Sequence, residues 1–266
     1  MRKHPKRRFF WICMMTGVLV AGTPVYASAE NGAVGNETEL PAPEGQIQPP
    51  DTLPAEPGSE GFVDDATNNT YGYYTVMGKT TVTSEQMTCQ FYSQNLPYPG
   101  EVLGQGGAPD MESFCEILME EAAAEGVRAE VVFAQVILET GWLQFQGVCR
   151  PEQYNFAGLG ATGGDEPGNC FPDVRTGLRA QVQHLKAYAS SEELEQECVD
   201  ERFDLVQREC APYVEWLGIQ ENPYGSGWAA GEHYGYKLRD LLAEMKGETY
   251  IWPQETREEN KSNVVQ

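Results

Sequence analysis

Basic residues are scarce in this sequence. Lys and Arg together number 18 against 40 Asp and Glu in 266 residues, giving a formal net charge of −22. Five of the basic residues fall at the very start of the chain: Arg2, Lys3, Lys6, Arg7 and Arg8. The remainder is therefore more acidic still, and such a surface repels nucleic acid and anionic lipid. This excludes polyanion-binding functions, and we expect no nucleic-acid partner.

Metal-binding and cofactor-binding patterns are also missing. The three histidines, His4, His184 and His233, are scattered, and no two cysteines have CxxC spacing. We therefore predict no metal site. The glycines from Gly158 to Gly163 match a dinucleotide-binding fingerprint in spacing, but the residues after them include Pro167 and do not open a helix. No cofactor is expected.

Long apolar runs are absent except for a short one near the N-terminus. It is densest from Phe9 to Ala21, follows the five basic residues and precedes Ala27-Ser28-Ala29. This order is typical of a signal peptide with its cleavage site, and the run is short for a membrane span. We predict a signal peptide over residues 1–29 and an exported protein. An uncleaved N-terminal anchor is the alternative, and no other stable membrane association is expected.

Cysteines are even in number beyond the predicted signal peptide. The six are Cys89, Cys115, Cys149, Cys170, Cys198 and Cys210. An even set in an exported chain indicates disulfides, although sequence alone cannot choose the connectivity. Proximity along the chain favours pairing Cys149 with Cys170 and Cys198 with Cys210. That choice leaves Cys89 with Cys115.

The chain divides by composition into a tether, a domain and a tail. Residues 30–69 are rich in Pro, Gly and acidic residues and predict a disordered tether. An ordered domain is predicted over residues 70–248, followed by a C-terminal tail at 249–266. Apolar periodicity and capping residues such as Asp110 and Gly126 predict helices. Their ranges are 84–93, 111–125, 129–139, 175–188, 192–199, 202–217 and 233–245. The glycine-rich residues 155–173 predict a hairpin or loop.

One carboxylate stands out within this pattern. Glu139 ends the predicted helix 129–139, which is apolar nearly all round, and Trp142 follows it closely. Burial raises the pKa of a carboxyl group, so Glu139 is a candidate general acid, as is the glutamate beside a tryptophan in lysozyme. This is glycosidase chemistry. The alternative is a solvated glutamate at a helix end, where the chain turns at Gly141.

Several segments taken together resemble the bacterial endo-β-N-acetylglucosaminidase family of cell-wall hydrolases. They occur in the family's order: Glu139-Thr140-Gly141-Trp142, Asn155-Phe156-Ala157-Gly158, residues 171–181, and Tyr234-Gly235-Tyr236-Lys237-Leu238. The resemblance implies an α+β, mainly α-helical, lysozyme-like domain with a small β-hairpin. It also implies cleavage of glycan strands of peptidoglycan on the reducing side of N-acetylglucosamine. We expect a bacterial, secreted, cell-wall-associated enzyme that is monomeric.

The resemblance also assigns roles to residues. It places the catalytic acid at Glu139 and the tyrosine that faces it at Tyr234, with Tyr236 a weaker match. The residues that line the sugar cleft fall at Asn155, Phe156 and Gly158. Trp142 and Phe156 can offer flat apolar faces to sugar rings, although core packing is the alternative for Trp142 and for Tyr234.

A second catalytic carboxylate is harder to place. The glycine-rich segment offers Asp165 and Glu166, and Asp173 lies just beyond it. Each is otherwise a solvated turn or cap residue. Without a second carboxylate, the acetamido group of the substrate can act as the nucleophile. Two rivals therefore stay open: a lytic transglycosylase on the same fold, which needs one acid, and a non-catalytic wall-binding module.

Overall fold

The computed structural model describes residues 73–147, 149–161 and 168–253. The predicted signal peptide, the whole predicted tether, Asp165 and Glu166 lie outside these ranges. The described residues are mainly helical, and none of their helices combines the length and apolarity needed to cross a membrane. The α-helices are α1 (Ser84–Ser93), α2 (Gly100–Leu103), α3 (Met111–Glu125), α4 (Ala129–Thr140), α5 (Val174–Ala189) and α6 (Tyr234–Lys246).

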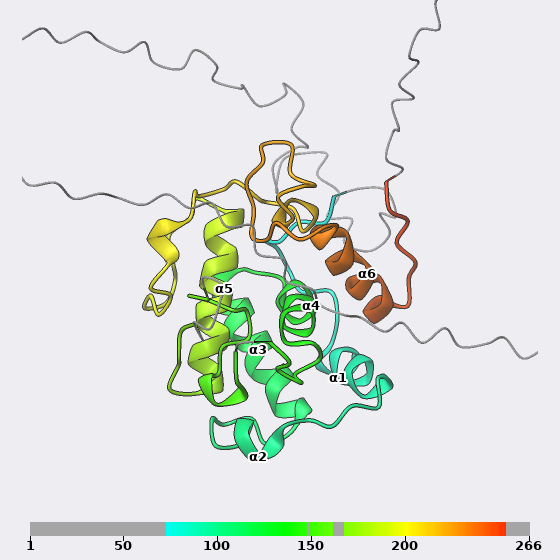
Figure 1. Cartoon of the computed structure of the whole chain (residues 1–266), viewed down its shortest axis with the longest axis vertical. Helices are drawn as coiled ribbons and strands as arrows, with labels where there is room; N and C mark the ends of the chain where they lie inside the picture. Colours follow the sequence, from blue (N-terminus) through cyan, green and yellow to red (C-terminus); the bar gives the residue numbers. More distant parts are fainter. Residues whose placement is uncertain (1–72, 148, 162–167, 254–266) are drawn as a thin grey trace, which may run out of the picture. The chain divides into compact units, whose positions relative to one another are not determined.

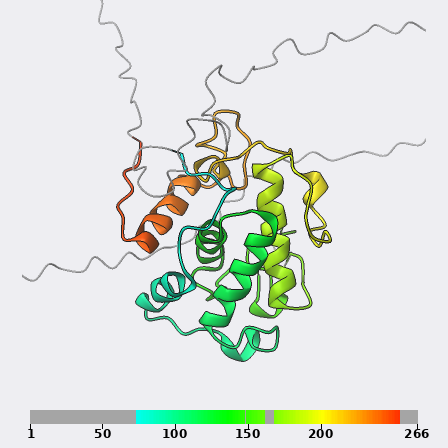
Figure 2. The same ribbon diagram turned by 180° about the vertical axis from the view of Figure 1, so that it is seen from behind.

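Helix α4 is the central element of the domain (Figure 1). Helices α3, α5 and α6 contact it, and Figure 2 shows α3 and α5 side by side when the molecule is seen from behind. Every residue from Ala129 to Ile137 is buried. A helix that is apolar all round can only be stable inside the core, which explains why this segment became the centre.

Local signals fix the ends of several helices. The Asp110 side chain accepts a hydrogen bond from the backbone N–H of Ser113 at 2.8 Å and caps α3. Gly126 ends that helix in the left-handed conformation with φ of 72°. Thr83 and Gln86 form a reciprocal capping box at the start of α1. The predicted helices over 84–93 and 111–125 are confirmed with these bounds.

The acidic helix predicted over residues 192–199 is wrong. Its backbone N–H groups bond to side chains from other helices instead of to carbonyls one turn back. The buried Glu125 carboxylate accepts from the N–H groups of Glu195 and Gln196, each at 3.0 Å. The Gln183 side chain accepts from Val199 at 2.8 Å. Side chains that satisfy the backbone in this way compete with helix formation.

The helix predicted over residues 202–217 is also wrong. Pro212 lies inside it, and proline removes a backbone donor and clashes with the preceding helical turn. The structure forms two short 3-10 turns there, Phe203–Leu205 and Glu215–Leu217. Between them the Pro212 carbonyl accepts a hydrogen bond from the Val76 backbone N–H at 3.0 Å. This segment therefore holds the start of the domain instead of forming a helix.

The predicted β-hairpin is not found in the described part of residues 155–173. Across the described ranges, β-pairing is limited to isolated bridges, such as Thr75 with Tyr213 and Met77 with Val127. Side chains organise the glycine-rich segment instead. The Asn155 amide donates to the carbonyls of Leu159 at 2.8 Å and Asn169 at 3.1 Å. The fold class is therefore mainly α.

No disulfide joins any two of the six cysteines in the described residues, so the predicted pairings are not confirmed. The Cys89–Cys115 pairing fails because Cys115 is buried and its sulfur accepts from the Thr88 hydroxyl at 3.6 Å, whereas Cys89 is exposed. The Cys198 thiol, also exposed, donates to the Asp200 carbonyl at 3.4 Å.

Candidate active site

Glu139 lies in the last turn of α4, where the chain leaves the core. The next residues turn sharply, because Gly141, Trp142 and Leu143 all have positive φ angles near 60°. The turn is held by the Thr140 hydroxyl, which accepts from the Leu143 backbone N–H at 2.8 Å. Glu139 is half-buried as a residue, at the boundary between the core and the surface.

Tyr234 brings a hydroxyl group to this carboxylate from α6. It is the first residue of that helix, and its hydroxyl donates to Glu139 Oε1 at 2.5 Å. The next residue, Gly235, explains how the helix start comes so close to the core. A Cβ atom there would lie 2.1 Å from the Glu215 carbonyl oxygen, so only glycine fits. The predicted meeting of Tyr234 and Glu139 is present in the structure.

Trp228 is a second donor to Glu139. Its hydrogen bond to the carboxyl group favours the ionised form. The indole ring rests on α5, where the rings of His184 and Tyr188 lie 4.9 Å and 5.7 Å from it between centroids. His184 is fixed in turn by Asp200, whose Oδ2 lies 2.6 Å from its Nδ1. The buried His184 ring and the partly buried Tyr188 ring thus support the group that touches the candidate acid.

Burial dominates the electrostatics of the site. It raises the pKa of Glu139 to about 7, and the hydrogen bonds from Tyr234 and Trp228 only partly oppose it. Burial and the nearby Glu139 charge likewise raise the pKa of Tyr234 well above its usual value. Both donors to Glu139 are neutral, so neither compensates a buried negative charge as a cation would. Near neutral pH the carboxyl group is therefore poised between its protonated and ionised forms.

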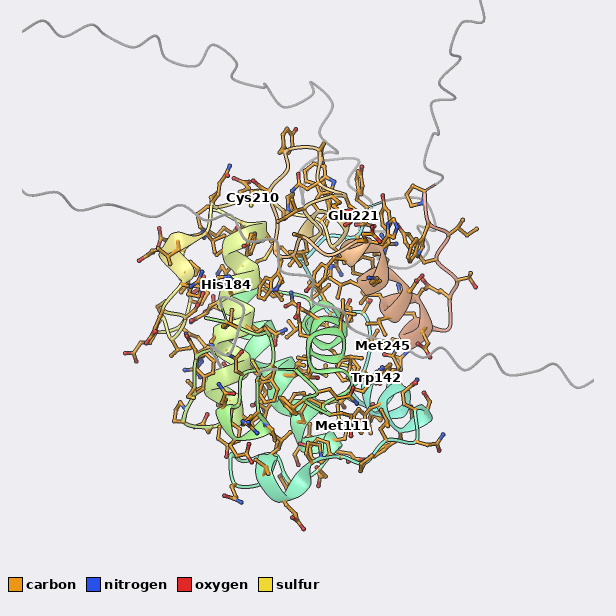
Figure 3. All side chains as sticks on the ribbon, in the orientation of Figure 1. Met111, Trp142, His184, Cys210, Glu221 and Met245 are labelled. Carbon is orange, nitrogen blue, oxygen red and sulfur yellow. The ribbon has the colours of Figure 1, made fainter. Side chains whose placement is uncertain are left out.

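The predicted sugar-contacting residues do not all reach the surface. Phe156 is 1% exposed and packs edge-on against Phe114 with ring centroids 5.1 Å apart, so it offers no face to a sugar. Asn155 is equally buried, and its side chain is used within its own loop. Gly158 and Trp142 are partly exposed. Figure 3 shows Trp142 and His184 on opposite sides of α4.

Asp173 has a role in the described structure that needs no catalysis. Its side chain accepts from the Thr176 backbone N–H at 2.7 Å and caps α5. This matches the cap reading of that residue rather than the base reading. Among the described residues, no carboxylate contributes to the Glu139 pKa. The other two candidates, Asp165 and Glu166, lie outside the described residues.

Two residues near Glu139 were not predicted from the sequence: Trp228 and Gln135, whose buried amide donates to the Tyr234 hydroxyl at 3.1 Å. Gln135 lies four residues before Glu139, one helical turn away on the same face, so its position is a usable signal. Trp228 lies in an irregular segment and carries no periodic signal. Within the described ranges, no group of three or more His, Cys, Asp and Glu side chains is placed to hold a metal ion.

Comparison with known proteins identifies the family. Residues 115–247, half of the chain, match the glucosaminidase family, described as mannosyl-glycoprotein endo-beta-N-acetylglucosaminidase. An uncharacterized protein of Borreliella burgdorferi is 39% identical over 127 residues, which cover 48% of this chain and 59% of that protein. The chain thus matches about three fifths of that relative's length. The matched region contains Glu139, Trp228 and Tyr234, and the chain belongs to the glucosaminidase family of glycoside hydrolases.

Proposed function

We propose that the protein is an exported cell-wall glycosidase that hydrolyses β-1,4 bonds of N-acetylglucosamine in peptidoglycan, with Glu139 as the general acid. One observation carries the proposal. Glu139 is a half-buried residue whose carboxyl group has a pKa raised to about 7 and accepts hydrogen bonds from two neutral donors. A general acid works best when its pKa lies near the working pH, because the group then holds a proton and still gives it up.

In the proposed reaction, Glu139 protonates the glycosidic oxygen as the bond to the sugar breaks. The ionised carboxylate that results is stabilised by the hydroxyl of Tyr234 and the indole of Trp228. The positive charge that develops on the sugar needs a nucleophile from the opposite side. Because the described residues place no second carboxylate beside Glu139, we assign this role to the acetamido group of the substrate. Water then opens the cyclic intermediate that this attack forms, and Glu139 takes a proton back from that water.

Export is part of the proposal and is supported by the sequence alone. The basic start, the short apolar run and Ala27-Ser28-Ala29 have the order of a signal peptide. The strongly acidic remainder of the chain fits a soluble protein outside the cell. Peptidoglycan as substrate is supported by the family and by the resemblance of the site segments.

The test is a digest of purified peptidoglycan with the mature protein. Fragments are reduced with borohydride and analysed by mass spectrometry, with the Glu139→Gln variant in parallel. We expect reduced N-acetylglucosamine ends from the wild type and none from the variant. Reduced muramic ends would instead identify a muramidase. If Glu139→Gln cleaves as well as the wild type while remaining folded, Glu139 is not the acid.

A lytic transglycosylase is the second candidate, and one observation favours it. That reaction needs a single acidic residue, and Glu139 has no carboxylate partner among the described residues. It would leave anhydro-muramic ends, which the same digest separates by mass. Absence of fragments from several wall types would favour a wall-binding module.

A further inference from the structure

A chain of hydrogen bonds runs from α5 through α4 to Glu139. The Gln181 amide nitrogen donates to Gln135 Oε1 at 2.9 Å. The Gln135 amide nitrogen donates to the Tyr234 hydroxyl at 3.1 Å, and that hydroxyl donates to Glu139 Oε1 at 2.5 Å. Both glutamines are fully buried. Neither can touch a substrate, so any effect on chemistry must pass through Tyr234.

A backbone carbonyl sets the direction of this chain. The Gln181 amide nitrogen also lies 3.4 Å from the carbonyl oxygen of Val132, which can only accept. Gln181 must therefore turn its nitrogen towards α4. Gln135 then presents its oxygen to Gln181 and its own nitrogen to Tyr234. Since an amide N–H only donates, the Tyr234 oxygen accepts there and its own proton is left for Glu139.

The arrangement leaves one buried group unsatisfied. The side-chain oxygen of Gln181 has no hydrogen-bond partner among the described residues. Buried polar atoms are normally paired, and an exception calls for an explanation. If position 181 served stability alone, an apolar side chain would fill it without leaving a buried polar atom unpaired. The unsatisfied oxygen is explained if Gln181 serves to set the direction in which the Gln135 amide and the Tyr234 hydroxyl donate.

We propose that Gln135 and Gln181 are positioning residues that aim the Tyr234 hydroxyl proton at Glu139, a proposal that rests on the proposed function. Because the Tyr234 hydroxyl then acts only as a donor towards Glu139, the proton that Glu139 delivers stays on the carboxyl group. Without the hydrogen bond from Gln135, the Tyr234 oxygen would be able to accept the Glu139 proton itself. That proton would then be held inside the protein, away from the glycosidic oxygen.

The test measures kcat and the pH dependence of kcat/KM for peptidoglycan cleavage in two Gln135 variants. Gln135→Met removes the donor at similar size, and Gln135→Glu replaces it with an acceptor. Because protonated Glu139 gains a bond to Tyr234 in either variant, its proton is held more tightly. We expect Gln135→Met to lower kcat about tenfold. The basic limb of the kcat/KM profile, where activity falls as the acid loses its proton, should move to higher pH by about one unit. Gln135→Glu should have the larger effect.

A double-variant cycle separates positioning from packing. In the Tyr234→Phe background there is no hydroxyl to aim, so Gln135→Met should not move the basic limb further. Gln90→Met is the matched control, because Gln90 is a buried amide on α1 that donates to the Leu241 carbonyl at 2.9 Å. It should leave the pH profile unchanged. Gln181→Met should move the basic limb in the same direction as Gln135→Met, but by less. It replaces the Gln135 variants as the test if they do not fold.

The outcomes are distinguishable. An unshifted basic limb in Gln135→Met, or the same shift with and without the Tyr234 hydroxyl, would overturn the positioning role while leaving the glycosidase intact. A wild type that makes no glycan fragments, or a Glu139→Gln variant that makes them normally, would remove the proposed function and this inference together. A shift that requires Tyr234 supports both.

Discussion

Glu125 and Glu139 occupy the ends of neighbouring helices, and each is followed closely by a glycine with positive φ. Their surroundings differ. The Glu125 carboxylate meets the Lys186 ammonium group at 2.9 Å and two backbone N–H groups, with both side chains almost fully buried. Among the described residues, the hydrogen-bond donors to the Glu139 carboxyl group are a phenol and an indole. The two carboxylates therefore share a position on their helices and differ in the charge of their partners, a cation for Glu125 and neutral donors for Glu139.

The largest effect on stability is expected at Glu125. Glu125→Gln leaves the Lys186 charge buried without a counter-charge, which should lower the free energy of unfolding by about 3–5 kcal/mol. Urea unfolding at neutral pH measures this. Glycan cleavage per folded molecule should stay unchanged, because the pair does not touch the Glu139 site.

Its control is the double variant Glu125→Leu with Lys186→Met. Replacing both charges by apolar side chains removes the unpaired ion, so most of the lost stability should return. An exposed ion pair contributes less than about 1 kcal/mol. A loss of stability that small in Glu125→Gln would contradict the prediction that the Glu125–Lys186 pair is buried and needs both charges.

The next prediction concerns the free energy of unfolding as a function of pH. Because the pKa of Glu139 is raised from 4.5 to about 7, folding favours its protonated form. The resulting stability is present below pH 4.5 and is lost as the pH rises to about 7. Over this range Glu139→Gln should gain about 3 kcal/mol of stability relative to the wild type.

Chemical denaturation of both proteins at several pH values measures that difference. Parallel stability curves would contradict the raised pKa of Glu139. Cleavage by the wild type should fall as the pH rises above about 7, because the acid then loses its proton.

The difference between the two glutamates was only partly visible in the sequence. The apolar pattern of residues 129–139 predicted both a central helix and an unusual carboxylate at its end. Tyr234 was predicted from resemblance and does meet Glu139. Residues 192–199 were predicted as a helix because their backbone partners, Glu125 and Gln183, lie far away in the sequence. Such long-range bonds leave no local pattern to read.

Trp228 is a residue of the candidate site that the local sequence pattern could not predict either. It lies in a segment without periodicity, between Gly227 and a short bridge from Gly218 to Ala229. A Cβ atom on Gly227 would come 2.7 Å from the Trp216 carbonyl oxygen, so the close approach there requires glycine. Only the folded structure shows that this approach brings an indole to Glu139.

Trp228→Phe tests the contribution of the neutral donors, because it removes one of them from Glu139. Phenylalanine keeps a ring against His184, and the loss of the N–H destabilises ionised Glu139. The pKa should rise further, moving the basic limb of kcat/KM upward by about one pH unit. Trp252→Phe is the matched control, since that indole donates to Asp240 at 3.0 Å on the surface. A limb that moves equally in both variants would exclude a specific role for Trp228.

The smallest effect is expected at Asp173, where the cap and base readings make opposite predictions. Asp173→Ala removes the N-cap of α5 and should lower the free energy of unfolding by about 1 kcal/mol, whereas asparagine caps nearly as well as aspartate. Asp173→Asn should therefore keep both stability and kcat in thermal unfolding and wall-digestion assays. A catalytic base would instead lose at least about a hundredfold in kcat on that change. Such a loss in a stable Asp173→Asn variant would supply the second carboxylate that Glu139 lacks among the described residues, and would replace the acetamido group as nucleophile.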